Sequence, residues 1–112
     1  MARLNSRFLV DLLVRRTEAA GGFAAILAKG DENSGTILVQ CSDRGNPGPL
    51  LERRFLLDGR HVWEPVGPDE SSDGESRANY QERRRKADPD LWIVDLDIAD
   101  APRLVAEWGA LT

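Results

Sequence analysis

The segment that decides the fold reads Arg83-Arg84-Arg85-Lys86-Ala87-Asp88-Pro89-Asp90-Leu91-Trp92-Ile93-Val94-Asp95-Leu96-Asp97. Its basic beginning suits the last turn of a helix, where cations complement the negative end of the helix dipole. Pro89 cannot continue a helix, and it disfavours the α conformation at Asp88. We therefore expect a helix that ends near Ala87.

The second half of this segment has the period of a strand. Apolar and acidic residues alternate, so one face of the strand would be dry and the other wet. The dry face would carry Trp92, Val94, Leu96 and Ile98, and the wet face Asp95 and Asp97. We expect a strand over 91–98 with Trp92 in the core.

Length and composition indicate one folded domain over residues 1–112. A chain of 112 residues can bury about two thirds of its unfolded surface without disulfides or metals. Charged residues make up 30% and apolar residues 41%, which is typical of a globular protein. The net charge of -4 conceals a pattern, because residues 1–30 sum to +3, 31–76 to -6, 77–86 to +4 and 87–100 to -5. No block of the chain is basic enough alone to indicate nucleic-acid binding.

The single cysteine, Cys41, excludes an internal disulfide. It lies in an apolar run and is expected to be a small core residue rather than a nucleophile, which suits a reducing cytoplasm. The apolar run 8–14 is interrupted by Asp11 and followed by Arg15 and Arg16, so it is too short and too charged to span a membrane. We expect a cytoplasmic protein with no membrane partner.

The N-terminal part reads as a helix over 6–20, capped by Asn5 or Ser6 and ended by Gly21-Gly22. Its apolar side would hold Phe8, Leu9, Leu12, Leu13, Ala19 and Ala20. Val10 and Val14 widen this face further, which predicts a helix that lies against a sheet along most of its length.

Four strands are expected next, as an antiparallel meander. The run 23–29 is apolar on both alternating faces, which favours a central strand, and the turn 30–35 would join it in a hairpin to 36–41. A second turn over 44–49 would lead to a strand over 50–57. Asp58-Gly59 would then turn the chain into 61–66. Pro65 lacks an N–H group, which favours an edge position for this last strand.

The C-terminal half supplies the remaining elements. Residues 67–76 are acidic and have nothing to bury, so we expect a mobile loop. A helix over 77–87 would lie on the rim with Tyr80 as its anchor, and Asp100 would cap a short helix. The apolar side of that short helix would be Leu104, Val105, Trp108 and Leu111. The predicted class is α+β: a mostly antiparallel sheet of about five strands against an N-terminal helix, with a rim helix and a short C-terminal helix.

A family resemblance is carried by the segments 4–16, Gly21-Gly22, Gly30-Asp31, Gly35, 83–88 and above all 88–96. In these segments the chain resembles the small alphaproteobacterial proteins grouped as domain of unknown function 1491. The chain departs from the family pattern in its Arg83 to Lys86 run and in a longer tail after residue 100. The resemblance implies a cytoplasmic α+β domain, and it supplies no catalytic residue because the family has no established activity.

One acidic cluster has the spacing of a metal or nuclease site: Asp88, Asp90, Asp95 and Asp97. The last two would share a strand face about 7 Å apart, where two carboxylates can hold a hard cation. No Lys follows on the same strand, as it would in a metal-dependent nuclease. A solvated strand face is the favoured interpretation, so we assign no metal and no cofactor, and metal-dependent hydrolysis is a third hypothesis.

Other catalytic patterns are not supported. His61 and Cys41 are the only histidine and the only thiol, which excludes a Cys/His zinc site by count. The glycines form no phosphate-binding loop between a strand and a helix. We therefore assign no catalytic residue and favour a protein that is not an enzyme.

A surface of aromatic and basic residues remains as the candidate binding site. Its members are Tyr80, Arg83, Arg84, Arg85, Asp88 and Asp90, and Trp63, Trp92 and Lys86 are further residues of the types that such a surface uses. Three consecutive arginines occupy most of a helix circumference, so at least one must point outward. We expect a non-enzymatic accessory domain that binds a macromolecular partner, with protein favoured by the net acidity and nucleic acid, bound through 83–86, as the alternative. The sequence does not determine the oligomeric state.

Overall fold

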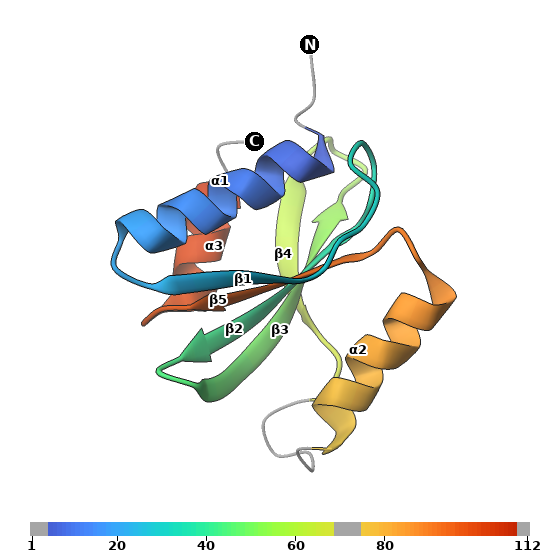
Figure 1. Cartoon of the computed structure of the whole chain (residues 1–112). Coiled ribbons are helices and arrows are strands. Elements are labelled where there is room, and N and C mark those ends of the chain that lie inside the picture. The colour runs from blue at the N-terminus through green and yellow to red at the C-terminus, as the bar shows by residue number, and fades with distance from the viewer. Residues whose placement is uncertain (1–4, 69–74, 110–112) are drawn as a thin grey trace.

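The computed structural model describes residues 5–68 and 75–109. Within them the chain forms three helices and five strands (Figure 1). In chain order these are α1 (Ser6–Ala19), β1 (Phe23–Ala28), β2 (Ile37–Asp43), β3 (Asn46–Phe55), β4 (His61–Val66), α2 (Glu75–Ala87), β5 (Trp92–Asp97) and α3 (Ala101–Gly109). This is the predicted α+β class, with a mostly antiparallel sheet, an N-terminal helix and two later helices.

The five strands form one sheet in the order β1-β5-β2-β3-β4. β5 enters between β1 and β2, antiparallel to β1 and parallel to β2. In that position Leu38 lies opposite Ile93, and Val39 opposite Val94. The segment that the sequence singled out is therefore the second strand of the sheet, paired on both sides.

The predicted hairpin between 23–29 and 36–41 is wrong, because β5 separates β1 from β2. The prediction that 23–29 is a central strand covered on both sides is also wrong, since β1 is an edge strand and Phe23 is 77% exposed. The physical reason is side-chain size. β1 is half alanine, whereas β5 buries Trp92, Ile93 and Leu96. An interior strand is covered on both faces, so placing the larger side chains there buries more apolar surface and stabilises the fold more.

The rest of the meander is confirmed, with one change at its first turn. β2, β3 and β4 pair antiparallel in succession, and β4 lies at the edge as Pro65 indicated. The turn predicted over 44–49 is shorter, because Arg44 and Gly45 alone take positive φ values of 53° and 80° and complete it. β3 therefore already begins at Asn46. Its first residues pair only with β2, so Pro47 can be accommodated there.

The main core lies between the sheet and the pair α1 and α3, which lie on the same face (Figure 1). α1 packs over β1 and β5, and α3 over β2 and β4. The fully buried side chains of this face include Leu9, Val10, Leu13, Ile37, Val39, Trp92, Val94, Leu96 and Val105. Trp92 is 0% exposed, which confirms its predicted place in the core.

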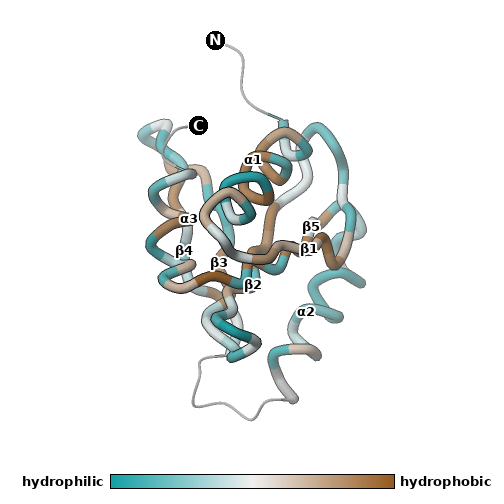
Figure 2. The backbone as a smooth tube through the Cα atoms, turned by 60° about the vertical axis from the view of Figure 1, so that its left-hand side comes forward, coloured by the Kyte–Doolittle hydropathy of each residue, from teal (hydrophilic) through white to brown (hydrophobic). Residues whose placement is uncertain are grey.

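The opposite face carries a smaller apolar cluster, made of Leu38, Leu50, Leu91 and Ile93. Tyr80 of α2 packs against this cluster, as predicted for a rim helix with an aromatic anchor. α2 is otherwise hydrophilic over most of its length (Figure 2). The helix must therefore be held to the sheet largely by polar contacts.

α1 follows the prediction at its start, where Asn5 is the N-cap and its side chain accepts the Phe8 N–H. Val10 and Val14 pack in the core as predicted, but three residues assigned to the apolar face do not. Phe8 is 54% exposed, and Ala19 and Ala20 are also exposed. The reason is that α1 lies above β1, the edge strand of the sheet (Figure 1), so the outer side of the helix has nothing to pack against.

Two predictions fall partly outside the described residues. The mobile acidic loop predicted over 67–76 lies mostly there, and α2 already begins at Glu75. α3 begins at Ala101, directly after Asp100, as predicted, and Val105 of this helix is buried in the core. Leu111 lies outside the described residues.

Candidate functional site

Asp90 is exposed, but its backbone carbonyl is closely packed against the loop 30–36. Its carbonyl accepts the Asp31 N–H at 3.0 Å. A Cβ atom on Gly30 or on Gly35 would overlap this same carbonyl. Both glycines are needed for close packing, since any side chain there would push the 88–90 turn away from the loop that precedes β2. The Gly30-Asp31 and Gly35 residues of the family resemblance are thus explained by packing.

Trp92 connects the loop 30–36 to the core. Its indole Nε1 donates to the Asp31 carbonyl at 2.7 Å, and its backbone N–H donates to the Thr36 carbonyl at 2.8 Å. Ser6 Oγ of α1 donates to the Gly35 carbonyl at 2.6 Å. One small network therefore joins α1, the loop 30–36 and the start of β5.

The Asp31 carboxylate closes the loop 30–36 from within. It accepts the Ser34 N–H at 2.8 Å, the Asn33 N–H at 3.1 Å and the Ser34 hydroxyl at 3.2 Å. Hydrogen bonds from Ser34, backbone first and hydroxyl second, lower the pKa of Asp31 below its ordinary value. The charged carboxylate is thus a structural part of this loop.

Arg85 and Asp88, both predicted binding residues, close the end of α2. Arg85 Nη1 donates to the carbonyls of Pro89 and Leu91. Asp88 Oδ1 accepts the Asp90 N–H at 3.1 Å, and the Asp88 N–H donates to the Arg84 carbonyl at 2.9 Å. These side chains satisfy backbone groups of the turn 88–91, which follows the helix.

Arg84 points toward the sheet. Its Nη1 lies 2.6 Å from Glu52 Oε1 of β3 and donates to the Tyr80 hydroxyl at 2.8 Å. Burial opposes the charged form of Arg84, but the bonds to Glu52 and Tyr80 outweigh it and raise the pKa of the guanidinium. Of the basic run 83–86, Arg83 and Lys86 are the exposed members, and Arg83 lies over the Tyr80 ring at 5.4 Å. The predicted outward-facing arginine is Arg83.

A second polar cluster holds the first half of α2. Asp95 Oδ1 accepts hydrogen bonds from Gln40 and Ser42 of β2, each at 2.9 Å. Gln81 of α2 donates to Gln40 Oε1 at 2.7 Å, and Arg77 Nη2 donates to the Cys41 carbonyl at 3.1 Å. Sequence reasoning missed this cluster. The sequence pattern that indicates this cluster is the spacing of the polar residues 77, 81 and 84, which places them on one side of α2. That side faces the polar residues of the strands.

The acidic residues 88, 90, 95 and 97 do not meet in one place. Asp97 accepts the backbone N–H groups of Arg44 and Gly45 at 2.7 Å and 3.0 Å, at the β2–β3 turn. Asp95 accepts hydrogen bonds from two residues of β2, whereas Asp88 and Asp90 lie in the turn that precedes the other end of β5. Over residues 5–68 and 75–109 no three His, Cys, Asp or Glu side chains come together as metal ligands.

Cys41 and His61 have structural surroundings. Burial raises the pKa of the Cys41 thiol to about 12, so it remains a neutral thiol at physiological pH. It is 1% exposed, which confirms the prediction of a small core residue. The His61 ring contacts the Phe55 ring edge to face, with centroids 4.9 Å apart.

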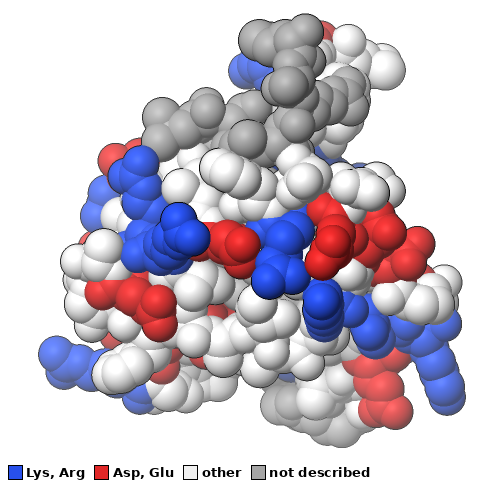
Figure 3. Space-filling model, turned by 45° about the horizontal axis from the view of Figure 1, so that its top comes forward, with Lys and Arg blue, Asp and Glu red and all other residues white. Residues whose placement is uncertain are grey.

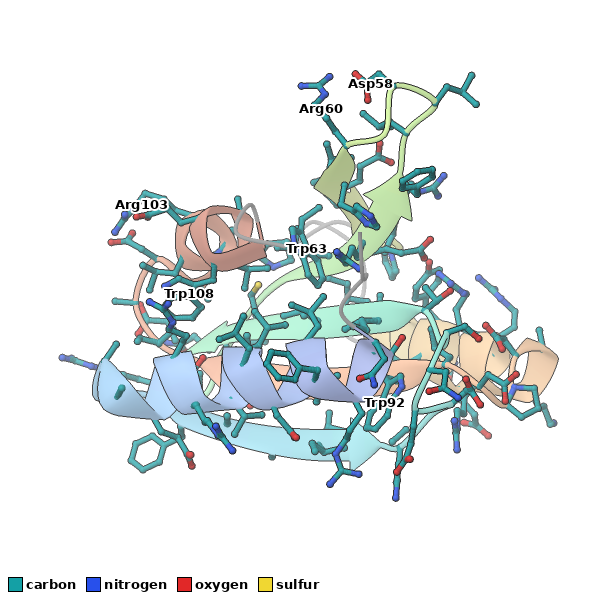
Figure 4. The ribbon with its side chains drawn as sticks, turned by 90° about the horizontal axis from the view of Figure 1, so that it is seen from above. Asp58, Arg60, Trp63, Trp92, Arg103 and Trp108 are labelled. Atoms are coloured by element: carbon teal, nitrogen blue, oxygen red, sulfur yellow. The ribbon has the colours of Figure 1, made fainter. Side chains whose placement is uncertain are left out.

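A pocket of about 310 Å³ lies between the start of α1 and the β3–β4 hairpin. Its lining includes Asn5, Asn33, Ser34, Arg53 and His61. The first N–H groups of α1 donate to the carbonyls of residues 32 and 33, so they are not directed at a ligand. Figure 4 shows that hairpin projecting from the body, with Asp58 and Arg60 at its tip and Trp63 nearer the core.

The outer edge of β1 is the most open feature of the sheet. No strand within the described parts of the chain pairs with this edge. Phe23 is 77% exposed, Leu27 52% and Ile26 44%, and the six residues of β1 include neither a charge nor a proline. Sequence reasoning missed this surface because it placed the run in the centre of the sheet. The alanine content of the run was the signal for an edge.

The fold and these contacts define a small α+β domain in which three helices flank an open five-stranded sheet. The family model of DUF1491, protein of unknown function, matches residues 4–106. The chain belongs to this family, in agreement with the resemblance noted from its sequence.

Solved structures of the family have the same fold. A crystal structure of a DUF1491 family protein from Caulobacter crescentus CB15 is 33% identical, with a TM-score of 0.72 over 83% of this chain and 86% of that one. An NMR structure of a DUF1491 family protein from the same organism is 32% identical, with a TM-score of 0.74 over 89% and 90%. The solution structure of a protein from A. tumefaciens is 32% identical, with a TM-score of 0.63 over 88% and 89%. The comparison with curated proteins finds no match.

None of the helices in the described segments has the length and apolarity needed to cross a bilayer.

Proposed function

We propose that this protein is a non-enzymatic cytoplasmic accessory domain that binds an extended stretch of polypeptide along the outer edge of β1. The observation that carries the proposal is the open, uncharged edge of β1 with its exposed Phe23, Ile26 and Leu27. Every second residue of an edge strand directs its N–H and C=O groups away from the sheet, where another strand can pair with them.

The contrast with the other sheet edge supports this proposal. Natural sheets protect their edges with charged residues and prolines. β4 follows this rule, since it contains Glu64 and Pro65, and α3 packs against it. β1 has only a bulge between Ile26 and Ala28. An apolar edge without such protection is the kind of surface that binds a partner strand.

The basic end of α2 supports a nucleic-acid function less well than its sequence suggested. Arg84 and Arg85 are used inside the molecule, so two exposed cations, Arg83 and Lys86, remain of the run. Two phosphate contacts provide little affinity at physiological salt. For this reason protein binding is the function we put forward.

The test places a photo-crosslinking residue at position 27 in cells that make the protein. Leu57, a fully exposed apolar residue at the tip of the β3–β4 hairpin, is the matched control position. We expect position 27, and not position 57, to crosslink to one contiguous stretch of polypeptide. Phe23→Lys in the same chain should reduce the yield. Equal crosslinking at both positions, or none at position 27, would contradict the proposal.

A further inference from the structure

We infer that the strand bound at β1 is β1 of a second copy of this chain, so that two sheets join edge to edge around a two-fold axis. This inference rests on the proposed function, because it names the partner of the same edge. β1 lies along the margin of the sheet, with α1 above it (Figure 4). An antiparallel pair of β1 strands would continue the hydrogen-bonding pattern of both sheets.

The apolar residues of β1 are distributed in a way that suits a symmetric pair. Phe23 and Ala25 lie opposite Asp97 and Asp95, and thus on the α2 side of the sheet. Ile26 lies opposite Val94, on the α1 side. Each copy therefore presents apolar side chains on both faces of the new junction, where the same side chains of the second copy can cover them.

The charges near β1 favour the antiparallel arrangement. β1 itself has no charged residue, so a second copy brings no like charges into the pairing. Lys29 follows directly after the strand. In an antiparallel pair the two Lys29 residues lie at opposite ends, more than about 20 Å apart, well beyond a screening length of about 8 Å. A parallel pair would place them together.

Closure also favours a second β1 over any other edge of this chain. If β1 paired with β4 of another copy, each copy would still expose one edge, and open chains of molecules would form. Glu64 and Pro65 on β4 oppose such pairing. Pairing of β1 with β1 is self-complementary and stops at two copies.

The interface is expected to be weak. A strand of six residues is about 20 Å long, and its edge buries less than the roughly 800 Å² per partner of a standard interface. The bulge between Ile26 and Ala28 limits regular pairing further. We expect a dissociation constant between about 10 µM and about 1 mM.

Sedimentation velocity over this concentration range tests the inference with charge variants. In the antiparallel pair, Phe23 of one copy lies within one residue of Leu27 of the other. Phe23→Lys with Leu27→Lys, and Phe23→Glu with Leu27→Glu, should each remain monomeric, and an equimolar mixture of the two should form a heterodimer. Leu57→Lys should dimerise as the parent does. Loss of dimer in the Leu57 variant, or failure of the mixture to associate while both variants remain folded, would overturn the inference.

A measurement on the parent alone covers the case in which the charge variants do not fold. Amide resonances of residues 23–28 should shift with protein concentration, while those of the hairpin near Leu57 should not. A parent that stays monomeric near 1 mM, the weak limit expected for small interfaces, overturns self-pairing. If position 27 still crosslinks to a different protein in cells, the proposed function stands without it. If nothing crosslinks there, the proposed function fails as well.

Discussion

At the scale of single residues, the most informative positions are those whose close contacts leave no room for change. Gly30 and Gly35 enclose the Asp90 carbonyl, and Trp92 bonds to the loop between them. These residues carried the family resemblance in the sequence. Their contacts give each of them a structural reason to be present, so the resemblance by itself identifies a fold rather than a chemistry.

Replacing Trp92 by Ala should lower the free energy of unfolding by about 3 to 5 kcal/mol, as for other buried aromatic side chains. Trp92 is 0% exposed, and the change also removes its hydrogen bond to Asp31. Urea denaturation compares the variant with the parent, and Trp108→Ala, at a partly exposed tryptophan of α3, should cost less. A urea unfolding curve of Trp92→Ala indistinguishable from that of the parent would place this side chain outside the core.

The Asp31 carboxylate should make stability depend on pH in acid. Because hydrogen bonds from Ser34 hold the pKa of Asp31 in the folded state below its ordinary value of 3.8, the unfolded state binds a proton more readily. The stabilisation is therefore complete above that value and is lost as pH falls through the folded pKa.

Asp31→Asn should thus be less stable than the parent at pH 7, and the difference should shrink below about pH 4, near the unperturbed pKa of an aspartate. Urea denaturation of both proteins from neutral pH into acid gives this difference. Ser34→Ala removes one of the hydrogen bonds to the carboxylate. At pH 7 its free energy of unfolding should lie between those of the parent and of Asp31→Asn. A difference equal at pH 7 and in strong acid would show that the charge of Asp31 is not involved.

At the scale of elements, α2 is the unusual one because polar contacts hold it to the sheet. Gln81, Arg77 and Arg84 bond to groups of β2 and β3, and Tyr80 supplies the apolar contact. Burial lowers the pKa of the Arg77 guanidinium, and the nearby Asp95 carboxylate opposes this effect. Hydrogen bonds and an ion pair, rather than a wide apolar face, hold α2 against the sheet.

A double-mutant cycle on Arg84 and Glu52 measures this docking. Their side chains are 26% and 13% exposed and lie 2.6 Å apart, so solvent screens the pair only in part. We expect Arg84→Ala and Glu52→Ala to be coupled by about 1 to 2 kcal/mol in the free energy of unfolding. The exposed pair of Arg103 and Glu107 on α3 serves as the control, with a coupling of about 0.3 to 0.5 kcal/mol. Equal coupling in the two cycles would mean that α2 is not held through Arg84.

At the scale of the whole molecule, the charges are mixed rather than separated. Figure 3 shows basic and acidic side chains interspersed on the face in view, without one large basic area. A polyanion meets attraction and repulsion together on such a surface. The sheet, by contrast, has two clearly different edges, and this asymmetry is the basis for the proposed polypeptide binding.

Nucleic acid should therefore not be retained specifically. Filter retention of labelled single- and double-stranded DNA and RNA at two salt concentrations measures this for the parent and for Arg83→Glu with Lys86→Glu. This pair of changes leaves the internal contacts of Arg84 and Arg85 intact. Binding through the run 83–86 at low salt should show a log–log salt slope of at most about 2, one per exposed cation of that run. A steeper slope that the double variant abolishes would favour the nucleic-acid hypothesis instead.

The sequence by itself determined the features that depend on neighbouring residues. The helix end at Ala87, the strand expected over 91–98 and found over 92–97, and the edge position of β4 all follow from local period, proline geometry and charge. It also identified Asp88 and Arg85 as notable residues. It could not show that their side chains satisfy the backbone of their own turn, because their contacts depend on how the chain folds back.

Only the tertiary structure decided the order of the strands and the surfaces that remain open. β5 and β2 are far apart in the chain, and nothing in either run states that they pair in parallel. Which strand lies beside β2 depends on the whole sheet. The interior position is taken by β5, because its side chains bury the most apolar surface on both faces of the sheet. The alanine-rich β1 is left at the edge, where its exposed backbone and Phe23 form the surface proposed to bind another strand.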